Sequence, residues 1–457
     1  MYHRLRKAFA TGSPPNFITA AMLASLSSLV LGTTWIIAPC TAKIEVETGI
    51  CEAKAQQLDP ELRDDFLADP LEEEPRDLIL PRLRVNRPYS PLELQAIERR
   101  LDRLNQIASE QLSQGETDTA FELWQRELKL RRVLGTQAEF TAIQRVAALA
   151  WEQQRAVEVR LLTLRTREIW EAVKMSLGEP PAEGFGSGEP SDPADSLISG
   201  AATVDIETLA ALAQTFETLR DIDSAVEVYQ QVIELSAGRD EAQTLQQESL
   251  AELHLEWFQF ADAADVYLAL LSKARSSGDT VTEIAYLEQL VYGYEQADAL
   301  LEAARAQTDL VALYQGQGEE EKLPGLLVAI AQNYRTLDLT DSAIEYYRAA
   351  YSAAQRFEQF SFSAQVLTDL GSLYESLDRP DDALGAYTLL VPVEQQAYND
   401  YGMMNAYDSI GQLQRQQGND REAFIAFQQG LAIADKLNIR QDYFIEQIDS
   451  VSGTDSP

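Results

Sequence analysis

The fold is decided by residues 366–390, VLTDLGSLYESLDRPDDALGAYTLL. Apolar residues at helical spacing predict two short amphipathic helices around a tight turn. On the first helix, Gly371 is small where the helices must touch, and Tyr374 follows it. On the second helix, Ala383 is small and Tyr387 lies one turn beyond it. Small residues let two helices cross closely, and the aromatic rings fill the space beside the crossing.

The same pattern recurs along the chain at a nearly constant interval. The second-helix alanines are separated by 38 residues and then by 40, and they are Ala225, Ala263, Ala303, Ala343, Ala383 and Ala423. The small first-helix position, twelve residues earlier, holds Ala213, Ala251, Val291, Ala331, Gly371 and Gly411. Aromatic residues fill most positions that match Tyr374 and Tyr387. One hairpin cannot bury both of its faces, so the copies must stack.

The pattern resembles the tetratricopeptide repeat (TPR), with six regular copies in residues 203–451. It departs from the family in its period, which is 40 residues here and usually about 34. The resemblance implies an all-α fold, a right-handed superhelical solenoid of about eight helical hairpins. It also implies a non-enzymatic scaffold for protein partners. The chain further resembles exported bacterial TPR proteins, including cyanobacterial ones.

Residues 91–177 form a more degenerate TPR-like block. Its helix-start signals are Ser90 as N-cap, Pro91 at the first position and Glu93 to close a capping box. Ala120 and Trp124 then stand where Ala383 and Tyr387 stand in the opening copy. In the following helical pair, Arg160 falls at the alanine position.

Three other segments differ in composition from the repeats. Residues 43–90 are rich in proline and acidic residues and are predicted to form a stalk, with Leu78-Ile79-Leu80 docking on the folded body. Residues 178–202 are rich in glycine and proline and predict a flexible insert, which separates two helical blocks or loops out from one array. Residues 452–457 form a tail.

Residues 1–42 form a hydrophobic segment with a basic start. Phe17–Ala38 carries no charge, and as a helix it would span about 33 Å, enough for a bilayer core of about 30 Å. Two main interpretations stay open, an uncleaved signal anchor and a cleaved signal peptide, with a cytoplasmic protein as the third. The first two place the body in the periplasm or a thylakoid lumen, and cleavage makes the protein secreted. There Cys40 and Cys51 either pair or stay as free thiols.

The composition of the 457-residue chain argues against several functions. Its net charge of −36 argues against nucleic-acid binding, which depends on Lys and Arg contacts to phosphates. Only two Cys and two His occur, so no metal site is expected. His254 stands at an aromatic packing position, and we expect it in the core rather than in a catalytic triad. No glycine-rich phosphate loop precedes a helix, and no cofactor is expected.

In TPR proteins, partners generally bind in the concave groove lined by first helices. The equivalent groove positions here are Glu207, Gln214, Glu217, Glu248, Glu252, Glu256, Glu288, Tyr292, Glu295, Gln332, Arg335, Gln365, Ser372, Glu375, Asn405, Asp408, Gln412 and Arg415. The first half of this groove is acidic and would favour a basic or amide-rich protein segment. The alternative is an ordinary solvated helix face.

The charge is distributed unevenly between the two helical regions. Residues 91–177 carry equal numbers of basic and acidic residues, whereas residues 203–451 carry three acidic residues for each basic one. The basic side chains of the first region are Arg126, Lys129, Arg131, Arg132, Arg155, Arg160, Arg165 and Arg167. They either meet anionic lipid or the acidic array, or they pair with acids on their own helices.

The main hypothesis is therefore a non-enzymatic adaptor that holds protein partners at a membrane, for example during assembly of a membrane complex. A homo-oligomer that assembles through the neutral block and the acidic array is one alternative. An enzyme built on a helical solenoid is the other, and it would require a convergent cluster of titratable groups in a deep pocket.

Overall fold

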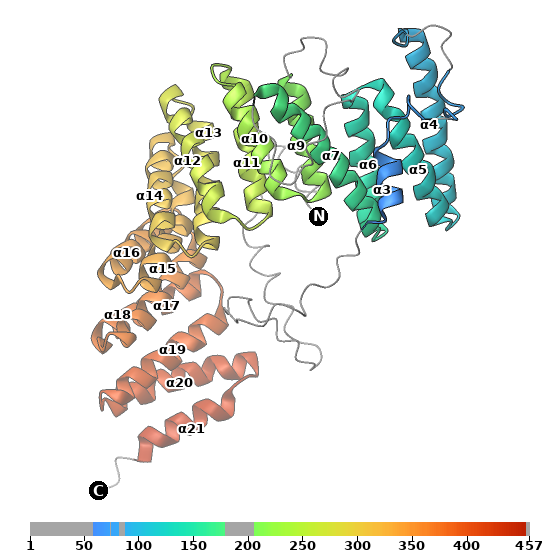
Figure 1. Ribbon diagram of the computed structural model, residues 1–457. Coiled ribbons are helices and arrows are strands. Elements are labelled where there is room, and N and C mark those ends of the chain that lie inside the picture. Colours follow the sequence, from blue (N-terminus) through green and yellow to red (C-terminus); the bar gives the residue numbers. More distant parts are fainter. Residues whose placement is uncertain (1–57, 74, 82–86, 179–204, 454–457) are drawn as a thin grey trace, which may run out of the picture. The chain divides into compact units, whose positions relative to one another are not determined.

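The computed structural model describes residues 58–73, 75–81, 87–178 and 205–453 (Figure 1). These residues form α-helices and two short 3₁₀ turns, without a β-strand among them. The all-α prediction is thus confirmed. The hydrophobic segment at 1–42, Cys40, Cys51 and nearly all of the insert predicted at 178–202 lie outside the described residues.

Eight helical hairpins follow one another through the described chain, as the repeat count predicts. They are α4 (Pro91–Ser113) with α5 (Thr117–Arg131), α6 (Thr136–Glu152) with α7 (Ala156–Leu177), α9 (Ile206–Leu219) with α10 (Ile222–Leu235), α11 (Asp240–Glu256) with α12 (Phe260–Ser277), α13 (Thr280–Gln296) with α14 (Leu300–Gln317), α15 (Leu323–Thr336) with α16 (Thr340–Arg356), α17 (Phe360–Ser376) with α18 (Pro380–Gln396), and α19 (Asp400–Gln416) with α20 (Asp420–Leu437). A short helix, α3 (Pro60–Leu67), precedes them and α21 (Gln441–Ser452) follows them. From α4 onward each helix packs against its neighbours in the sequence, whereas α3 packs on α5 and α7.

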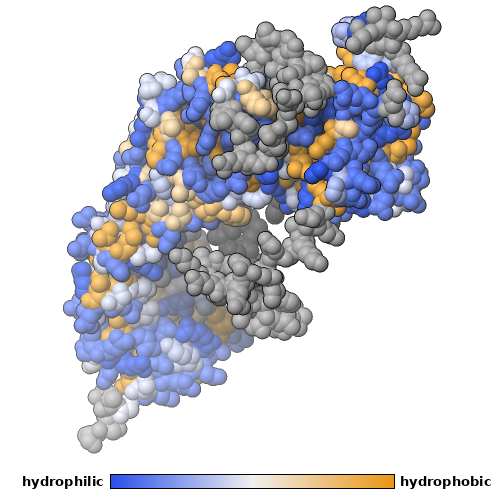
Figure 2. All heavy atoms as spheres, viewed as in Figure 1, coloured by the Kyte–Doolittle hydropathy of each residue, from blue (hydrophilic) through white to orange (hydrophobic). Residues whose placement is uncertain are grey.

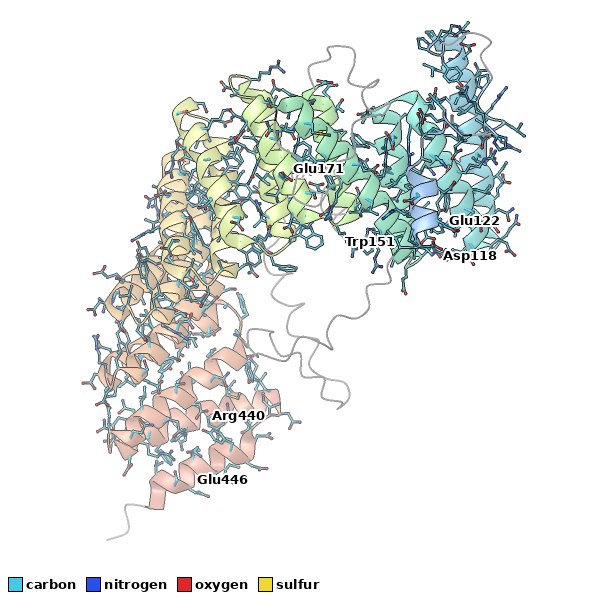
Figure 3. All side chains as sticks on the ribbon, viewed as in Figure 1. Asp118, Glu122, Trp151, Glu171, Arg440 and Glu446 are labelled. Atoms are coloured by element: carbon cyan, nitrogen blue, oxygen red, sulfur yellow. The ribbon has the colours of Figure 1, made fainter. Side chains whose placement is uncertain are left out.

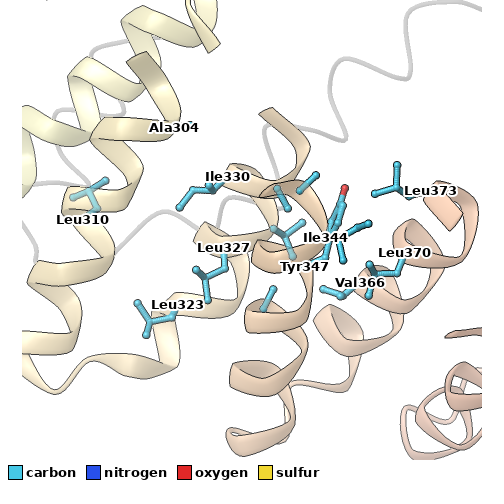
Figure 4. Close-up of a cluster of buried hydrophobic side chains, with 14 of the residues drawn as sticks. Ala304, Leu310, Leu323, Leu327, Ile330, Ile344, Tyr347, Val366, Leu370 and Leu373 are labelled. Carbon is cyan, nitrogen blue, oxygen red and sulfur yellow. The ribbon is translucent and has the colours of Figure 1, made fainter. Parts of the chain in front are cut away.

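The hairpins close through the small and aromatic residues that define the repeat. A Cβ atom on Gly371 would lie 2.5 Å from the ring of Tyr387, so only glycine fits there without movement of the ring. Ala383 is fully buried on the facing helix. Tyr347 fills the equivalent space one repeat earlier, among apolar side chains of α15, α16 and α17 (Figure 4). His254 is also buried, with Nδ1 2.7 Å from Gln259 Oε1, which confirms it as a packing residue.

The hairpin of α6 and α7 differs from its prediction by one residue. Val159, not Arg160, is the fourth residue of α7, the place that Ala225 and Ala263 occupy in α10 and α12. Val159 is buried and Arg160 is exposed. The predicted register was wrong by one residue because this helical pair lacks the alanine that marks the register in the other repeats.

The two helical regions on either side of the insert form one continuous stack. α6 and α7 both pack on α9. Trp151 Nε1 donates to Thr218 O at 3.0 Å, and its ring lies 4.4 Å from the guanidinium of Arg220. Arg167 forms an ion pair with Asp221 at 2.7 Å. The helices before and after the insert therefore belong to a single array, which agrees with the second of the two predicted arrangements.

Part of the predicted stalk is folded against the first hairpin. Phe66 on α3 and Leu80 are buried, and Ile79 is partly buried, whereas Leu78 is 93% exposed. The guanidinium of Arg132 donates to the carbonyl oxygens of residues 66, 67 and 68. Residues 58–73 and 75–81 thus differ from a solvated stalk, because apolar side chains spaced among the prolines and acids find a matching surface on α4 and α5.

The first long helix begins as predicted. Ser90 caps α4, and its backbone N–H donates to Glu93 Oε2 at 2.8 Å in a complete capping box. Arg87 donates to the same carboxylate, and together with the bonds from Ser90 it lowers the pKa of Glu93 to about 2.

The last helix, α21, occupies the place of a further first helix and has no partner helix after it among the described residues. Phe444 is buried one 40-residue period after the buried Met404. Asp442, Glu446 and Asp449 lie exposed on the opposite side (Figure 3 labels Glu446). An acidic outer face on a terminal helix keeps the end of a repeat array in solution.

Candidate functional site: the first-helix face

The predicted groove positions lie on the first helices α9, α11, α13, α15, α17 and α19, and we call this set the first-helix face. Glu207, Gln214, Glu252, Glu288, Tyr292, Glu295, Gln332, Arg335, Gln365, Ser372 and Glu375 are exposed, and Glu217, Glu248, Gln412 and Arg415 are partly buried. Successive first helices contact each other directly. For example, Gln332 on α15 and Asp369 on α17 lie 3.4 Å apart, and Gln144 on α6 donates to Thr215 on α9 at 3.0 Å.

Tyrosine hydroxyls hold several carboxylates of this face. Two of these bonds join the helices of one hairpin, since Tyr229 donates to Glu217 at 2.8 Å and Tyr387 donates to Glu375 at 2.6 Å. Tyr286 likewise donates to Glu248 at 2.5 Å and Tyr314 to Glu288 at 2.9 Å. Burial, followed by the bond to Glu375, raises the pKa of Tyr387 to about 12. These hydroxyls therefore stay protonated and act as neutral donors at physiological pH.

No Lys or Arg of the described residues forms an ion pair with Glu217, Glu248, Glu288, Glu295 or Glu375. Glu295 also has a neutral partner, the amide of Gln307, at 2.9 Å. Burial raises the pKa of both Glu217 and Glu295. The carboxylates are thus oriented by their hydrogen bonds, but their negative charge is not compensated within the described chain.

The basic side chains of the first region have the opposite arrangement. Arg126 pairs with Asp77 at 2.6 Å, and Lys129 pairs with Asp65 at 3.2 Å, both on the segment before α4. Lys129 also pairs with Glu73. The other ion pairs of this set join Arg131 to Asp102 and Glu127, Arg132 to Glu139, Arg155 to Asp118 and Glu158, Arg165 to Glu139 and Glu168, and Arg167 to Asp221. Pairing within single helices, one of the predicted alternatives, accounts for only some of these ion pairs. These cations hold segments of the protein together and do not form a free basic surface.

One end of the first-helix face is covered. Gln412 donates to Tyr443 Oη at 2.9 Å, and Arg415 donates to Gln447 at 2.7 Å, both on α21. Arg440, which is labelled in Figure 3 and lies at the start of α21, pairs with Asp408 at 2.6 Å. The groove positions on α19 are therefore used to attach the terminal helix.

A depression of about 340 Å³ lies beside Gln365, between α17 and the connection from α18 to α19. Asp369, Glu394 and Asn399 line it as well, and Glu394 is buried with one oxygen accepting from Asn399 Nδ2 at 2.8 Å. The sequence pattern missed Glu394, although it stands where the neighbouring second helices have Ala354 and Ala434. Burial raises the pKa of Glu394.

The described residues contain no group of three or more His, Cys, Asp or Glu side chains that could hold a metal ion. Within the same ranges, none of the helices is both long and apolar enough to cross a bilayer. The predicted N-terminal helix falls outside these ranges. Hydrophilic residues cover much of the visible helical surface, with smaller hydrophobic patches between them (Figure 2).

The raised pKa of Glu217 predicts a dependence of stability on pH. Burial is the main cause of the raised pKa. The hydrogen bond from Tyr229 lowers the pKa, and the negative charges of Glu256 and Glu252 raise it further. A carboxyl whose pKa is higher in the folded than in the unfolded state favours folding when it is protonated. The free energy of unfolding therefore falls as the pH rises from the unfolded-state pKa through the folded-state pKa of this carboxyl. We expect Glu217→Gln, which keeps an acceptor for Tyr229, to be more stable than the parent at pH 7. The difference should vanish below about pH 4, where the unfolded chain is also protonated.

Thermal unfolding of both proteins between pH 3 and 8 measures this effect. Glu234→Gln, an exposed position on α10, is the matched control and should show the parent pH profile. Equal stabilities of Glu217→Gln and the parent at pH 7 would contradict the prediction.

Comparison with known proteins identifies the repeat. Two family models described as tetratricopeptide repeat match residues 362–436 and residues 206–238 and 324–357. No protein with a curated description matches the sequence. TPR proteins generally mediate protein–protein interactions, and their fold is typically a non-enzymatic scaffold.

Solved structures with a similar helical arrangement include BtubC (BKLC) from P. vanneervenii, at 19% identity over 52% of this chain and 93% of that chain, with a TM-score of 0.32. MamA matches at 19% identity over 41% of this chain and 96% of the MamA chain, with a TM-score of 0.29. Aspartyl phosphate phosphatase F from Bacillus subtilis matches at 14% identity over 68% of this chain and 78% of the phosphatase chain, with a TM-score of 0.33. The matched models and the stacked hairpins with their small and aromatic contacts agree, and the chain therefore contains tetratricopeptide repeats within residues 206–436.

Proposed function

We propose that this protein is a non-enzymatic adaptor whose first-helix face binds a basic segment of a protein partner. The observation that supports it is the set of carboxylates on α9, α11, α13 and α17 that accept bonds from tyrosine hydroxyls and form no ion pair within the described residues. Their orientation is set before a partner arrives, so little ordering cost opposes binding. Arg or Lys side chains of a partner would supply the missing positive charge.

Binding of a flexible Gly/Ser peptide with four basic residues to the full chain tests this function. The variant Glu217→Gln/Glu248→Gln/Glu288→Gln/Glu375→Gln removes four charges and keeps four acceptors for tyrosine. Each exposed pair contributes about 0.2–1 kcal/mol, so loss of four pairs should weaken binding by about fourfold to several hundredfold, measured by fluorescence anisotropy at low salt. Binding of the parent should weaken as salt increases.

The matched control removes the same charge from second helices, through Glu234→Gln/Asp265→Asn/Glu345→Gln/Glu422→Gln. These side chains are exposed and lie on α10, α12, α16 and α20. Equal losses in both variants would mean that only the total charge matters, and would refute a specific role of the first-helix face. Absence of binding by the parent would refute the function itself.

We further propose that the body lies on the extracytoplasmic side of a membrane, in the periplasm or a thylakoid lumen, and takes part in assembly of a membrane complex. This rests on the uncharged stretch Phe17–Ala38 and the basic residues before it. Carbonate extraction of membranes tests the anchor, because an anchored chain stays in the pellet. Release of the intact chain would contradict it.

A further inference from the structure

Four aromatic residues gather where the turn between α11 and α12 meets α13. The rings of Phe258 and Phe260 lie 6.0 Å apart, and those of Phe260 and Tyr292 lie 6.3 Å apart, both edge to face. Trp257 precedes Phe258 in the same turn. The side chains of Phe258, Tyr292 and Trp257 are 79%, 49% and 39% exposed. We call Trp257, Phe258, Phe260 and Tyr292 the aromatic patch.

The fold does not require a large apolar residue at Phe258. Its φ is +61°, a left-handed conformation that is costly for bulky side chains. The same turn position holds Asp298, Asp338, Asp378 and Gly418 in later hairpins, residues that tolerate this conformation well. Because most of the Phe258 ring is in solvent, burial does not offset the strain. An unfavourable backbone conformation that no packing interaction of the side chain offsets points to a functional use of that side chain.

Tyr292, like Phe258, is an exposed aromatic residue at a position where the other repeats have small or polar residues. The equivalent positions of the other first helices hold polar residues, namely Gln214, Glu252, Gln332, Ser372 and Gln412. Tyr292 alone among them places an aromatic ring on the first-helix face, and half of that ring is exposed. Its contact with Phe260 connects this face to the turn that carries Phe258.

Carboxylates surround the aromatic patch. Glu288 and Glu295 lie one helical turn before and after Tyr292 on α13, and Glu256 ends α11 next to Trp257. Glu288 accepts from the hydroxyl of Tyr314 and Glu295 from the amide of Gln307, and Asn333 is a second neutral partner of Glu295. Exposed aromatic rings beside uncompensated carboxylates suit one cation best. A guanidinium stacks on aromatic faces, forms forked bonds to carboxylates and is weakly hydrated, whereas an ammonium is a strongly hydrated point charge.

We propose that the aromatic patch is a docking site for arginine side chains of the basic partner segment, and that it selects arginine over lysine. This inference rests on the proposed function, since it names the residue type that the first-helix face recognises. The guanidinium stacks on Phe258 or Tyr292 while Glu288 and Glu295 accept its N–H groups.

Two Gly/Ser peptides of equal length and charge, one with four arginines and one with four lysines, test the selection against the full chain. We expect the parent to bind the arginine peptide about threefold to tenfold more tightly. Phe258→Asp and Tyr292→Gln should each reduce this ratio towards one. Phe258→Asp installs the residue of three other hairpins and adds a negative charge, so a weaker arginine complex could come only from loss of the ring. Its thermal stability should equal or exceed that of the parent, which excludes unfolding as the cause.

Tyr398→Asn is the matched control. Tyr398 is 95% exposed with a φ of +54°, but it lies in the turn between α18 and α19, away from the patch in sequence and in fold. This variant should keep the full preference for arginine. Equal affinity of the parent for both peptides, or a preference that survives in both patch variants, would overturn the inference while leaving the proposed function intact. Binding of neither peptide would overturn both.

Discussion

Glu127→Ala is expected to lower the free energy of unfolding of the first two hairpins by about 3–4 kcal/mol. The carboxylate of Glu127 is completely buried on α5. It accepts from Arg131 Nε at 2.5 Å, and both of its oxygens accept from Arg145 Nη2 at 2.8 Å. Removing it leaves two guanidinium groups without their shared counter-charge, in positions where water replaces it poorly.

Thermal melting and amide hydrogen exchange on α5 and α6 measure this loss, since stability in a repeat array is local to neighbouring units. Glu122→Ala is the control, because Glu122 is exposed on the same helix (Figure 3) and its loss should change stability by less than about 0.5 kcal/mol. Glu127→Met combined with Arg145→Met should be less damaging than Glu127→Ala, because it leaves fewer buried charges unpaired. Similar melting temperatures for Glu127→Ala and Glu122→Ala would contradict the prediction.

Gly371→Leu should destabilise the hairpin of α17 and α18 by about 3 kcal/mol. The new side chain would have to begin 2.5 Å from the ring of Tyr387, whose hydroxyl is held by Glu375. Either the two helices separate or the ring leaves its buried position, and both lose packing contacts. Hydrogen exchange should increase most in α17 and α18.

Gly385→Leu provides the same substitution on the other helix of the same hairpin. Nothing lies within 4 Å of a Cβ atom added there, and the residue is exposed. Replacing glycine in a helix interior should therefore stabilise this variant by roughly 0.5–1 kcal/mol. A melting temperature for Gly371→Leu equal to that for Gly385→Leu would show that the close approach at Gly371 is not needed.

The packing of the hairpins was predictable because it depends on residue size at fixed spacing. Gly371 and Tyr387 had to meet, and the 40-residue period of Ala303, Ala343 and Ala383 placed every later hairpin. The predicted register was wrong by one residue at Arg160 and Val159, where that alanine is missing. The exposed positions of the first helices followed from the same register.

The partners of the polar groups were less predictable. Tyr229 and Tyr387 were assigned as packing residues, which they are, but their hydroxyls also hold Glu217 and Glu375. A sequence pattern places a ring in the core without giving the direction of its polar end. The ion pair of Arg126 with Asp77 likewise joins residues far apart in the chain, and local charge spacing could not reveal it.

The sequence by itself determined that this is a stacked array of TPR hairpins with an acidic second part, because helix periodicity and small–aromatic contacts are local and repeat. Only the tertiary structure decided which charged side chains have an ion-pair partner within the described residues. It folds residues 58–73 and 75–81 onto the first helical region, attaches α21 to Gln412 and Arg415, and leaves the carboxylates around Tyr292 with neutral partners. Charge compensation depends on which segments lie next to each other in space, and that is a property of the folded chain.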